Sequence, residues 1–404
     1  MERHDVVVIG GGQAGLSVSH ELAMLDIEHV VLERRRIGQA WRDRWDSFCL
    51  VTPNWMIQLP GRPHSGGDPD GYLPRDQIVE YLEDYAATFD LPVREGIDVL
   101  RVARRSAGGF VLETTDGSIE AGRLIVCSGA YAGPHRPSGA TSLPPSIVQV
   151  DSGAYRNPDA LPPGGVLIVG SGQSGCQLAD ELRLAGRMVV LACGRTGWSP
   201  RRISGRDVMW WTIETGYLDT TVGSLPTPAA RLTGNVLGTG HDGGYDLHLR
   251  TLRAAGVTLT GHFLGAEGGQ LRFAPDLAET VAWGDARYEE FIAAIRKVVA
   301  ERQMPEPRID PPAAFDGAAP TELPLTDFGS VIFASGYRPD YGQLLPWPEA
   351  FDNMGFPLQV DGLSTVIDGL YFAGVHYLRK RKSALLYGVG EDAAIVARSV
   401  ARRG

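Results

Sequence analysis

The stretch that decides the fold is Asp5-Val6-Val7-Val8-Ile9-Gly10-Gly11-Gly12-Gln13-Ala14-Gly15, near the start of the 404-residue chain. A short β-branched run, typical of a buried strand, leads into a glycine cluster, and an apolar, helix-like segment follows to about Leu25. A similar stretch recurs at 166–175, where Val-Leu-Ile-Val precedes Gly-Ser-Gly-Gln-Ser-Gly. A second strand-like run follows each helix, at 28–32 and at 187–191. The chain therefore contains an imperfect internal duplication.

The spacing Gly-x-Gly-x-x-Gly between a strand and a helix is the fingerprint of a dinucleotide-binding unit. The first glycine permits a sharp turn, the second lets backbone N–H groups approach a pyrophosphate, and the third lets the helix pack closely on the strand. The helix amino terminus adds partial positive charge. The alternative is that the two glycine-rich turns bind no ligand. The presence of two copies, each between a strand and a helix, disfavours this alternative. The predicted nucleotide-binding residues are Gly10, Gly12, Gln13, Ala14 and Gly15 in the first copy and Gly170, Gly172, Gln173, Ser174 and Gly175 in the second.

The ends of the second strands distinguish the two predicted sites. Eighteen residues after Gly15 stands Glu33, a carboxylate that accepts from ribose hydroxyls and repels a 2′-phosphate, so the first site suits FAD. The equivalent position in the second copy is Cys193, which Gly194 and Arg195 follow. A guanidinium there suits the 2′-phosphate of NADPH, and Arg201 and Arg202 follow soon after. An ordinary solvated loop arginine is the alternative for Arg195.

Two further apolar runs that end in Ser-Gly bracket the second copy, at 124–129 and 331–336. We interpret them as the points where the chain leaves and re-enters the first domain, although two unrelated buried strands would look the same. The predicted fold is α/β, with two Rossmann-like dinucleotide-binding domains and the NADPH domain inserted into the FAD domain. The predicted boundaries are 1–160 and 329–404 for FAD and 161–328 for NADPH, with linkers at 134–145 and 305–320 that are rich in Pro, Gly and Ala.

Composition excludes several other classes of protein. The formal charge is −10 without a long basic block, which disfavours nucleic-acid and anionic-membrane partners. The four cysteines lack CxxC spacing, so dithiol and tetrahedral zinc chemistry are not expected, and the histidines lack metal-ligand spacing. No apolar run approaches the length of a spanning helix, and no signal-peptide pattern is present. We expect a soluble cytoplasmic protein without a metal site, and a homodimer is left open.

The residues also resemble the flavin-containing monooxygenases, which use FAD and NADPH in one chain and include the plant YUCCA-type enzymes. Besides both glycine motifs and Glu33, the resemblance rests on Gly38-x-x-Trp41, Arg44–Phe48, Gln58-Leu59-Pro60, Phe333–Tyr337, Tyr371–Val375 and Gly388–Ala394. One marker departs from the family pattern, because Tyr155 is present but Asp151 stands at the position of the family histidine. This departure leaves the substrate type open between N- or S-oxygenation and oxygen insertion beside a carbonyl.

The resemblance implies a monooxygenase in which NADPH reduces FAD and a C4a-hydroperoxyflavin, formed with dioxygen, oxygenates a small molecule. It implies that Gln39, Trp41, Arg44, Thr52, Ser128, Gly129, Ser335, Gly336, Gly374 and Lys382 contact a cofactor and that Asn54 is catalytic. Asn54 as a turn residue after proline is the alternative. Trp41, Trp45, Trp55, Met56, Trp210 and Trp211 are candidates for an apolar wall or for plain core. Arg379, Lys380 and Arg381 are expected to be solvated. The competing function is an NADPH-dependent flavoprotein reductase without oxygen transfer.

Overall fold

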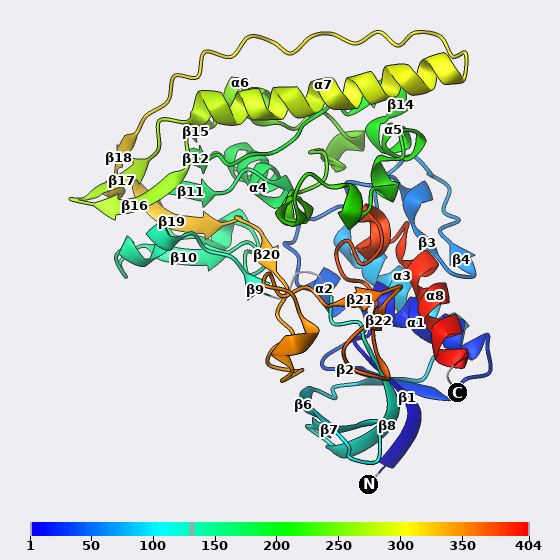
Figure 1. The fold of residues 1–404 in the computed structure, drawn as a ribbon. Coiled ribbons are helices and arrows are strands. Elements are labelled where there is room, and N and C mark those ends of the chain that lie inside the picture. The colour runs from blue at the N-terminus through cyan, green and yellow to red at the C-terminus, as the bar shows by residue number, and fades with distance from the viewer. Residues whose placement is uncertain (1, 130–132, 403–404) are drawn as a thin grey trace.

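The protein contains two α/β units, each built on a sheet of parallel strands (Figure 1). The computed structural model describes residues 2–129 and 133–402. Strands β1 (Glu2–Ile9), β2 (His29–Glu33) and β11 (Gly165–Val169) form where short runs of valine, leucine and isoleucine were expected to be buried. Every residue of β2 and β11 is buried, as is usual for parallel strands covered on both faces. The expectation of an α/β chain is confirmed.

β1 is the central one of the parallel strands of the first sheet. Its parallel part runs, in spatial order, through β23 (Leu370–Phe372), β8 (Gly117–Val126), β1, β2 and β5 (Val93–Glu95). Antiparallel strands extend it, namely β6 (Val99–Arg104) and β7 (Phe110–Thr114) beside β8, and β21 (Gln359–Val360) and β22 (Leu363–Ser364) beside β23. The carboxyl end of β1 therefore lies between the ends of β8 and β2, where the first glycine turn begins.

The second sheet repeats this arrangement. Its parallel strands are, in spatial order, β10 (Val148–Asp151), β19 (Phe328–Phe333), β11, β12 (Val189–Ala192) and β15 (Thr258–Thr260). An antiparallel ribbon of β16 (Phe263–Glu267), β17 (Gln270–Phe273) and β18 (Glu322–Pro324) lies beside it (Figure 1). β11 thus occupies the place that β1 holds in the first sheet, and the second glycine turn follows it.

Helices flank both sheets. They are α1 (Gln13–Ala23), α2 (Gln39–Arg42), α3 (Arg75–Thr88) and α8 (Val389–Ala401) in the first unit, and α4 (Gln173–Leu184), α5 (Val208–Glu214), α6 (Leu249–Ala254) and α7 (Leu277–Glu301) in the second. α1 packs against both α3 and α8. α7 runs along the outer side of the second unit, and the chain after it returns beside it to β18 (Figure 1).

The strands at both joins pair differently from the expectation. β10 lies within the predicted first part and β19 within the predicted returning segment, but both pair in the second sheet. The chain therefore crosses back after Phe333, and the segment 305–320 connects α7 to β18 instead of linking the units. The two crossings pair with each other through β9 (Gly133–Pro134) and β20 (Tyr337–Arg338). Neither Val148–Asp151 nor Phe328–Phe333 has a local sequence feature that indicates which sheet it joins.

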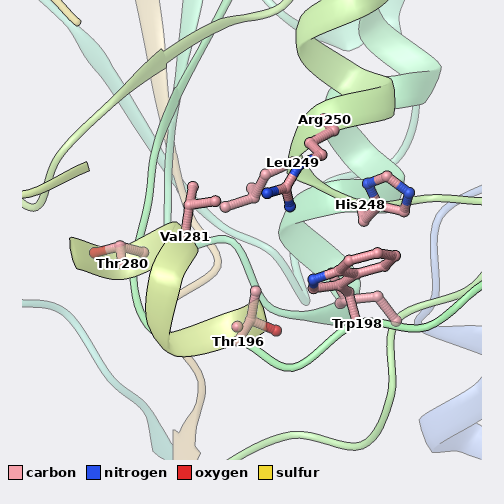
Figure 2. Close-up of a pocket in the computed structure, with 9 residues that line it drawn as sticks. Thr196, Trp198, His248, Leu249, Arg250, Thr280 and Val281 are labelled. Carbon is pink, nitrogen blue, oxygen red and sulfur yellow. The ribbon is translucent and has the colours of Figure 1, made fainter. Parts of the chain in front are cut away.

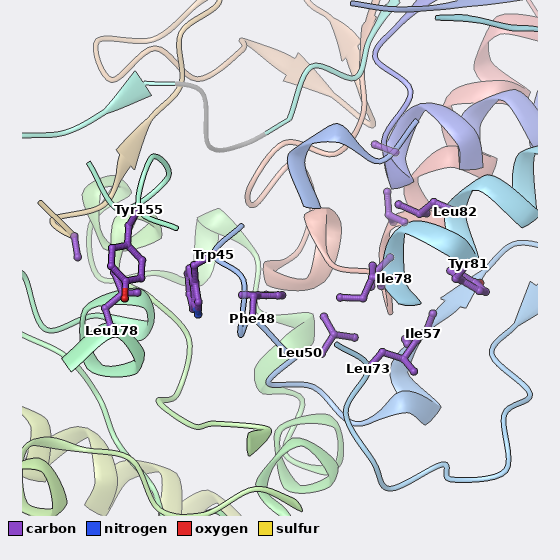
Figure 3. Close-up of a cluster of buried hydrophobic side chains, with 14 of the residues drawn as sticks. Trp45, Phe48, Leu50, Ile57, Leu73, Ile78, Tyr81, Leu82, Tyr155 and Leu178 are labelled. Atoms are coloured by element: carbon purple, nitrogen blue, oxygen red, sulfur yellow. The ribbon is translucent and has the colours of Figure 1, made fainter. Parts of the chain in front are cut away.

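One buried cluster of apolar side chains joins the two units. Figure 3 shows Trp45 lying between Phe48 of the first unit and Tyr155 with Leu178 of the second. Trp45 and Phe48 meet edge to face with ring centroids 5.0 Å apart. Ile57, Leu73 and Ile78 continue the cluster toward α3. The two units therefore share a continuous core rather than a thin, wet interface.

Candidate active site

The first glycine turn has the shape that its sequence predicts. Gly10 adopts φ +110°, and a Cβ there would lie 2.5 Å from the carbonyl oxygen of Cys127. A Cβ on Gly15 would lie only 1.8 Å from the carbonyl oxygen of Gly10, because α1 packs directly on the turn. At Gly12, in contrast, a Cβ would meet no described atom within 4 Å. The turn is thus closed toward the sheet and open at its middle glycine, which is the cradle a pyrophosphate requires.

The carboxylate of Glu33 closes one side of this turn. It is buried at the end of β2, where Gly11 donates its backbone N–H to Oε2 at 2.7 Å and Arg35 donates its own to Oε1 at 2.9 Å. Two backbone donors fix the orientation of the carboxylate beside the turn. Each carboxylate oxygen retains a lone pair that can accept from a further hydroxyl.

The second glycine turn repeats the geometry closely. Gly170 has φ +107°, and a Cβ on Gly175 would lie 1.9 Å from the carbonyl oxygen of Gly170. A Cβ on Gly172 would meet no atom of the described chain within 4 Å. Ser174 follows in the first turn of α4, where Ala14 stands in α1. Both turns therefore fit a dinucleotide pyrophosphate on the same structural grounds.

The strand end beside the second turn carries no carboxylate. Cys193 is buried, and the hydroxyl of Ser171 both accepts from Gly194 N at 3.0 Å and donates to Gly194 O at 2.9 Å. Arg195 follows with its side chain exposed, and no carboxylate in the described ranges forms an ion pair with it. A serine hydroxyl thus fixes the backbone here, whereas Glu33 fixes it in the first unit.

Arg201 and Arg202, which follow Arg195 in the sequence, form contacts within the protein. Arg201 is 2% exposed, pairs with Asp207 at 2.7 Å and places its guanidinium 4.6 Å from the Tyr72 ring. Arg202 donates to the carbonyl oxygens of Gly243 and Gly244. The sequence did not indicate these contacts, because Tyr72, Gly243 and Gly244 are distant from the two arginines along the chain.

The glutamine that begins α1 and the glutamine that begins α4 each bind a loop segment that lies beside the glycine turn. Gln13 donates to the carbonyl oxygen of Ala384 at 3.2 Å and accepts from Trp41 Nε1 at 3.0 Å. Gln173 donates to the carbonyl oxygen of Gly238, and accepts from Gly238 N at 3.1 Å. The two glutamines occupy equivalent positions, so each unit brings one connecting segment up to its glycine turn by the same means.

Other predicted cofactor residues gather at the carboxyl ends of the sheets. A Cβ on Gly374, after β23, would lie 2.4 Å from the Cβ of Ala14. Ser128 and Gly129 follow β8, and Ser335 and Gly336 follow β19, so the two pairs occupy equivalent places. Gln39 bonds to Asp43, Arg44 places its guanidinium 5.7 Å from the Phe48 ring, and Thr52 is half-buried. Their cofactor contacts stay predictions.

Asn54 is buried and both ends of its amide are engaged. Nδ2 donates to the carbonyl oxygen of Asp68 at 2.9 Å, and Oδ1 accepts from Leu73 N at 2.8 Å. The side chain therefore fixes the loop between these two residues against the segment that begins at Pro53. This position fits the turn interpretation, and a catalytic role for Asn54 stays a prediction.

The expectation that Arg379, Lys380 and Arg381 are solvated is wrong for Arg381, whereas Arg379 and Lys380 are partly exposed and form ion pairs. Arg379 pairs with Asp361 at 2.9 Å, and Lys380 pairs with Glu391 at 2.7 Å. Arg381 is 6% exposed and its guanidinium lies 4.2 Å from the Tyr217 ring. Lys382 also bridges two carboxylates, with Nζ 3.1 Å from both Asp219 and Glu391. A flavin contact by Lys382 stays a prediction.

The candidates for an apolar wall divide into two groups. Met56 and Trp211 are fully buried in one cluster, against which Trp55 and Trp210 pack. Trp41 and Trp45 belong instead to the cluster shared by the two units. The group of Met56, Trp55, Trp210 and Trp211 connects residues 203–218 of the second unit with the first unit. This contact lies near Tyr387, whose ring is 6.3 Å from that of Trp55.

Sequence reasoning missed the carboxylate that ties the two units together. Glu181 on α4 accepts from Ser47 Oγ at 2.8 Å and from the hydroxyl of Tyr155 at 3.1 Å. Burial raises the pKa of Glu181 above its ordinary value, although both hydrogen bonds oppose this shift. A lone glutamate on a helix gives no sign in the sequence that it binds a residue more than a hundred positions away.

A small enclosed site lies between α6 and α7. Figure 2 shows Trp198 and His248 facing its interior, with Val281 on α7 opposite. The cavity measures about 10 Å³, which is at the lower limit for one water molecule. Arg250 forms a bidentate pair with Asp285 at 2.8 and 2.7 Å, and Trp198 Nε1 donates to the same carboxylate at 2.9 Å. The site is a packed structural contact and not a substrate chamber.

We expect His248 to make the protein less stable in acid. Burial lowers the pKa of His248 from 6.5 to about 4, an effect that the neighbouring carboxylates of Asp246 and Asp285 reduce. The unfolded chain therefore binds the proton more readily, and stability is full above pH 6.5 and falls as the pH drops toward 4. The expected loss is up to about 3 kcal/mol. The His248→Asn variant keeps a helix-capping side chain but removes the titrating imidazole. Urea unfolding of the native protein and of this variant should give free energies of unfolding that converge as the pH falls. Parallel curves of free energy against pH would contradict the lowered pKa of His248.

All four cysteines are reduced and buried. Burial raises the pKa of Cys49 to about 11 and that of Cys176 to about 12, and it raises the pKa of Cys127 and Cys193 as well. A thiol with a raised pKa and no access to solvent is a poor nucleophile. The cysteines are therefore packing residues.

Two further properties concern the described residues as a whole. No helix among them combines the length and the hydropathy that crossing a bilayer demands. Within the same ranges, no group of His, Cys, Asp and Glu side chains is arranged to hold a metal ion.

Comparison with known proteins identifies the family. The family model described as pyridine nucleotide-disulphide oxidoreductase matches residues 7–211. An uncharacterised CzcO-like oxidoreductase of Geobacillus kaustophilus is 30% identical over 391 residues, which is 96% of each chain. The indole-3-pyruvate monooxygenase YUCCA4 of Oryza sativa is 30% identical over 263 residues, or 55% of this chain and 59% of that protein.

A solved structure shares the whole fold. The flavin-containing monooxygenase from Stenotrophomonas maltophilia aligns with a TM-score of 0.70 at 21% identity, covering 100% of this chain and 99% of the other. The resemblance to flavin monooxygenases that the sequence indicated is thus confirmed, as is the expectation of an enzyme with FAD and NADPH as cofactors. The chain belongs to the pyridine nucleotide-disulphide oxidoreductase family and is an FAD-dependent oxidoreductase.

Proposed function

We propose that the protein is a monooxygenase with two dinucleotide-binding domains, in which the Gly10–Gly15 turn holds FAD and the Gly170–Gly175 turn holds NADPH. The NADPH domain is inserted into the FAD domain, and the two crossings are the paired strands β9 and β20. The observation that carries this proposal is the pair of glycine turns, which have the same open middle glycine but opposite electrostatics at the neighbouring strand end.

The chain's own residues explain the choice of nucleotide at each turn. The Glu33 carboxylate, held by two backbone N–H groups, accepts from the ribose hydroxyls of FAD and repels a 2′-phosphate. At the second turn the exposed Arg195 guanidinium follows the strand end where no carboxylate stands. A forked cation there favours NADPH over NADH. Gln13 and Gln173 orient the segments that lie across the two turns.

When bound, FAD supplies two-electron chemistry, in which electrons from NADPH reduce dioxygen so that one oxygen atom enters the substrate and the other leaves as water. The protein must keep water away from this chemistry. The cluster around Met56 and Trp211, closed by Trp55 and Trp210, provides a dry surface between the first unit and the second. The proposed substrate is a small molecule with a soft nucleophilic nitrogen or sulfur atom, or a carbonyl compound.

The competing function is a reductase that passes electrons from NADPH to a quinone, an electron-carrier protein or a disulfide. The family name includes disulphide oxidoreductases, so the cysteines are the decisive groups. Each is buried with a raised pKa, and none has a partner at CxxC spacing. This favours oxygen transfer over disulfide reduction.

A stopped-flow experiment tests the proposal. NADPH is added without oxygen, and we expect the yellow flavin absorbance to disappear. After oxygen is admitted, we expect a spectrum distinct from both the oxidised and the reduced flavin to persist before the oxidised spectrum returns. A sulfide or amine substrate should shorten this phase and lower the yield of hydrogen peroxide. Immediate return of oxidised flavin with one hydrogen peroxide per flavin would instead identify a reductase.

A further inference from the structure

The strand end beside the second glycine turn has a second neighbour, His262, close to the residue that precedes Arg195. In the second sheet Ala192 of β12 pairs with Thr260 of β15. Gly194 and His262 each lie two residues beyond this pair, so parallel strands carry both to the same edge of the sheet. A Cβ on Gly194 would lie 3.7 Å from His262 Nε2. The imidazole therefore borders the backbone that Ser171 fixes beside the second turn.

An aspartate positions this imidazole. Asp276, which precedes α7, contacts His262 Nδ1 through Oδ2 at 2.6 Å and accepts from His262 N through Oδ1 at 3.0 Å. Burial would raise the pKa of Asp276, but the hydrogen bonds from His262 outweigh it and hold that pKa below its ordinary value. The ionised carboxylate engages Nδ1, so Nε2 is the nitrogen left to contact a ligand. The His262 side chain is 50% exposed, which leaves Nε2 accessible.

The chemistry of this edge matches a phosphate monoester. An imidazole whose Nδ1 faces a carboxylate has Nε2 available for a phosphate oxygen, while the Arg195 guanidinium supplies a forked pair of donors. Gly194, which precedes Arg195 in the chain and approaches His262 in space, has no side chain to obstruct an approaching group. The edge thus presents an imidazole and a guanidinium, and the carboxylate of Asp276 is already engaged by His262.

We propose that His262, positioned by Asp276, binds the 2′-phosphate of NADPH together with Arg195 and is a specificity-determining residue for this cofactor. The inference rests on the proposed function, since it requires NADPH at the second glycine turn. In this proposal His262 contacts the phosphate and not the ribose, because its Nε2 borders Gly194, two residues beyond the strand pair and directly before Arg195.

Calorimetric titration of the FAD-loaded protein with adenosine 2′,5′-bisphosphate and with 5′-ADP tests the inference without turnover. The native protein should prefer the bisphosphate. His262→Ala should lower the affinity for the bisphosphate about tenfold, because a charge-assisted hydrogen bond is lost, and should change the affinity for 5′-ADP less than about twofold. Asp276→Asn keeps the acceptor for His262 N and should give a smaller loss for the bisphosphate alone. His262→Arg should restore binding.

Matched controls separate the possible outcomes. His64→Ala removes another histidine, near Tyr81 in the first unit, and should change neither affinity. If Arg195→Ala abolishes the preference for the bisphosphate and His262→Ala does not, the inference fails while the proposed function stands. An equal loss of both ligands in His262→Ala would also overturn it, since it would indicate a structural role. If the native protein binds neither ligand, the assignment of the second turn to NADPH fails as well.

Discussion

Replacing Gly12 with alanine should give a correctly folded protein that loses most of its FAD, whereas the same replacement at Gly15 should destabilise the fold. Gly12 has an ordinary extended backbone, with φ −90° and ψ −173°, and its Cβ would point into open space. A methyl group there displaces only a ligand, and we expect FAD affinity to fall about 100-fold, or about 3 kcal/mol. At Gly15 the Cβ would lie 1.8 Å from a backbone oxygen, which no side-chain movement can relieve.

The measurements are flavin content after purification, circular dichroism and thermal unfolding of the two variants. Gly15→Ala should cost about 3 kcal/mol or more of stability through overpacking. Gly172→Ala is the matched control, since it alters the equivalent position of the second turn and should keep FAD while weakening NADPH binding. A Gly12→Ala protein that retains its full complement of flavin would contradict the placement of FAD at this turn.

Asp207→Asn should produce the largest loss of stability among single substitutions outside the glycine turns. Asp207 neutralises Arg201, whose guanidinium is 2% exposed, and accepts from the Tyr72 hydroxyl at 2.6 Å. Asparagine retains the acceptor that caps α5 through Met209 N. It removes the charge, however, and leaves a buried guanidinium without a counterion. We expect the free energy of unfolding to fall by about 3–5 kcal/mol.

Urea unfolding of the native protein, Asp207→Asn and Tyr72→Phe measures this effect. Tyr72→Phe keeps the ion pair, removes the hydroxyl that donates to the same carboxylate and accepts from Arg201 Nε, and should cost about 1–2 kcal/mol. Because Tyr72 belongs to the first unit and Arg201 to the second, the Asp207 variant should also loosen the contact between units. Equal losses in the two variants would show that the ion pair does not carry the stability assigned to it.

The sequence predicted the parts of the site whose residues are neighbours along the chain. The glycine turns and Glu33 were found because a nucleotide cradle is built from a strand, a turn and the next strand, all within about thirty residues. The choice of sheet for the strands at 148–151 and 328–333 was not predictable, since both pair with partners distant in sequence. The residues of these two strands do not themselves indicate which sheet the strands enter.

Charged residues were misjudged for the same reason. Arg381 reads as one of four consecutive basic residues, but its aromatic partner Tyr217 lies more than 160 positions away. Arg201 is buried only because Tyr72 and Asp207 approach it from two segments. The local sequence pattern predicts whether a side chain favours solvent. Tertiary contacts decide whether that side chain is exposed to solvent in the folded protein.

The position of β23, at the end of the parallel part of the first sheet, has a consequence for folding during synthesis. During synthesis, residues 148–333 leave the ribosome with every strand of the second sheet, so that sheet can assemble at once. The first sheet contains β1 and β8 but lacks β23 and the covering helix α8 until residues 370–401 emerge. The β8 residues that pair with β23, Leu124–Val126, therefore stay without that partner while more than two hundred residues are synthesised after them.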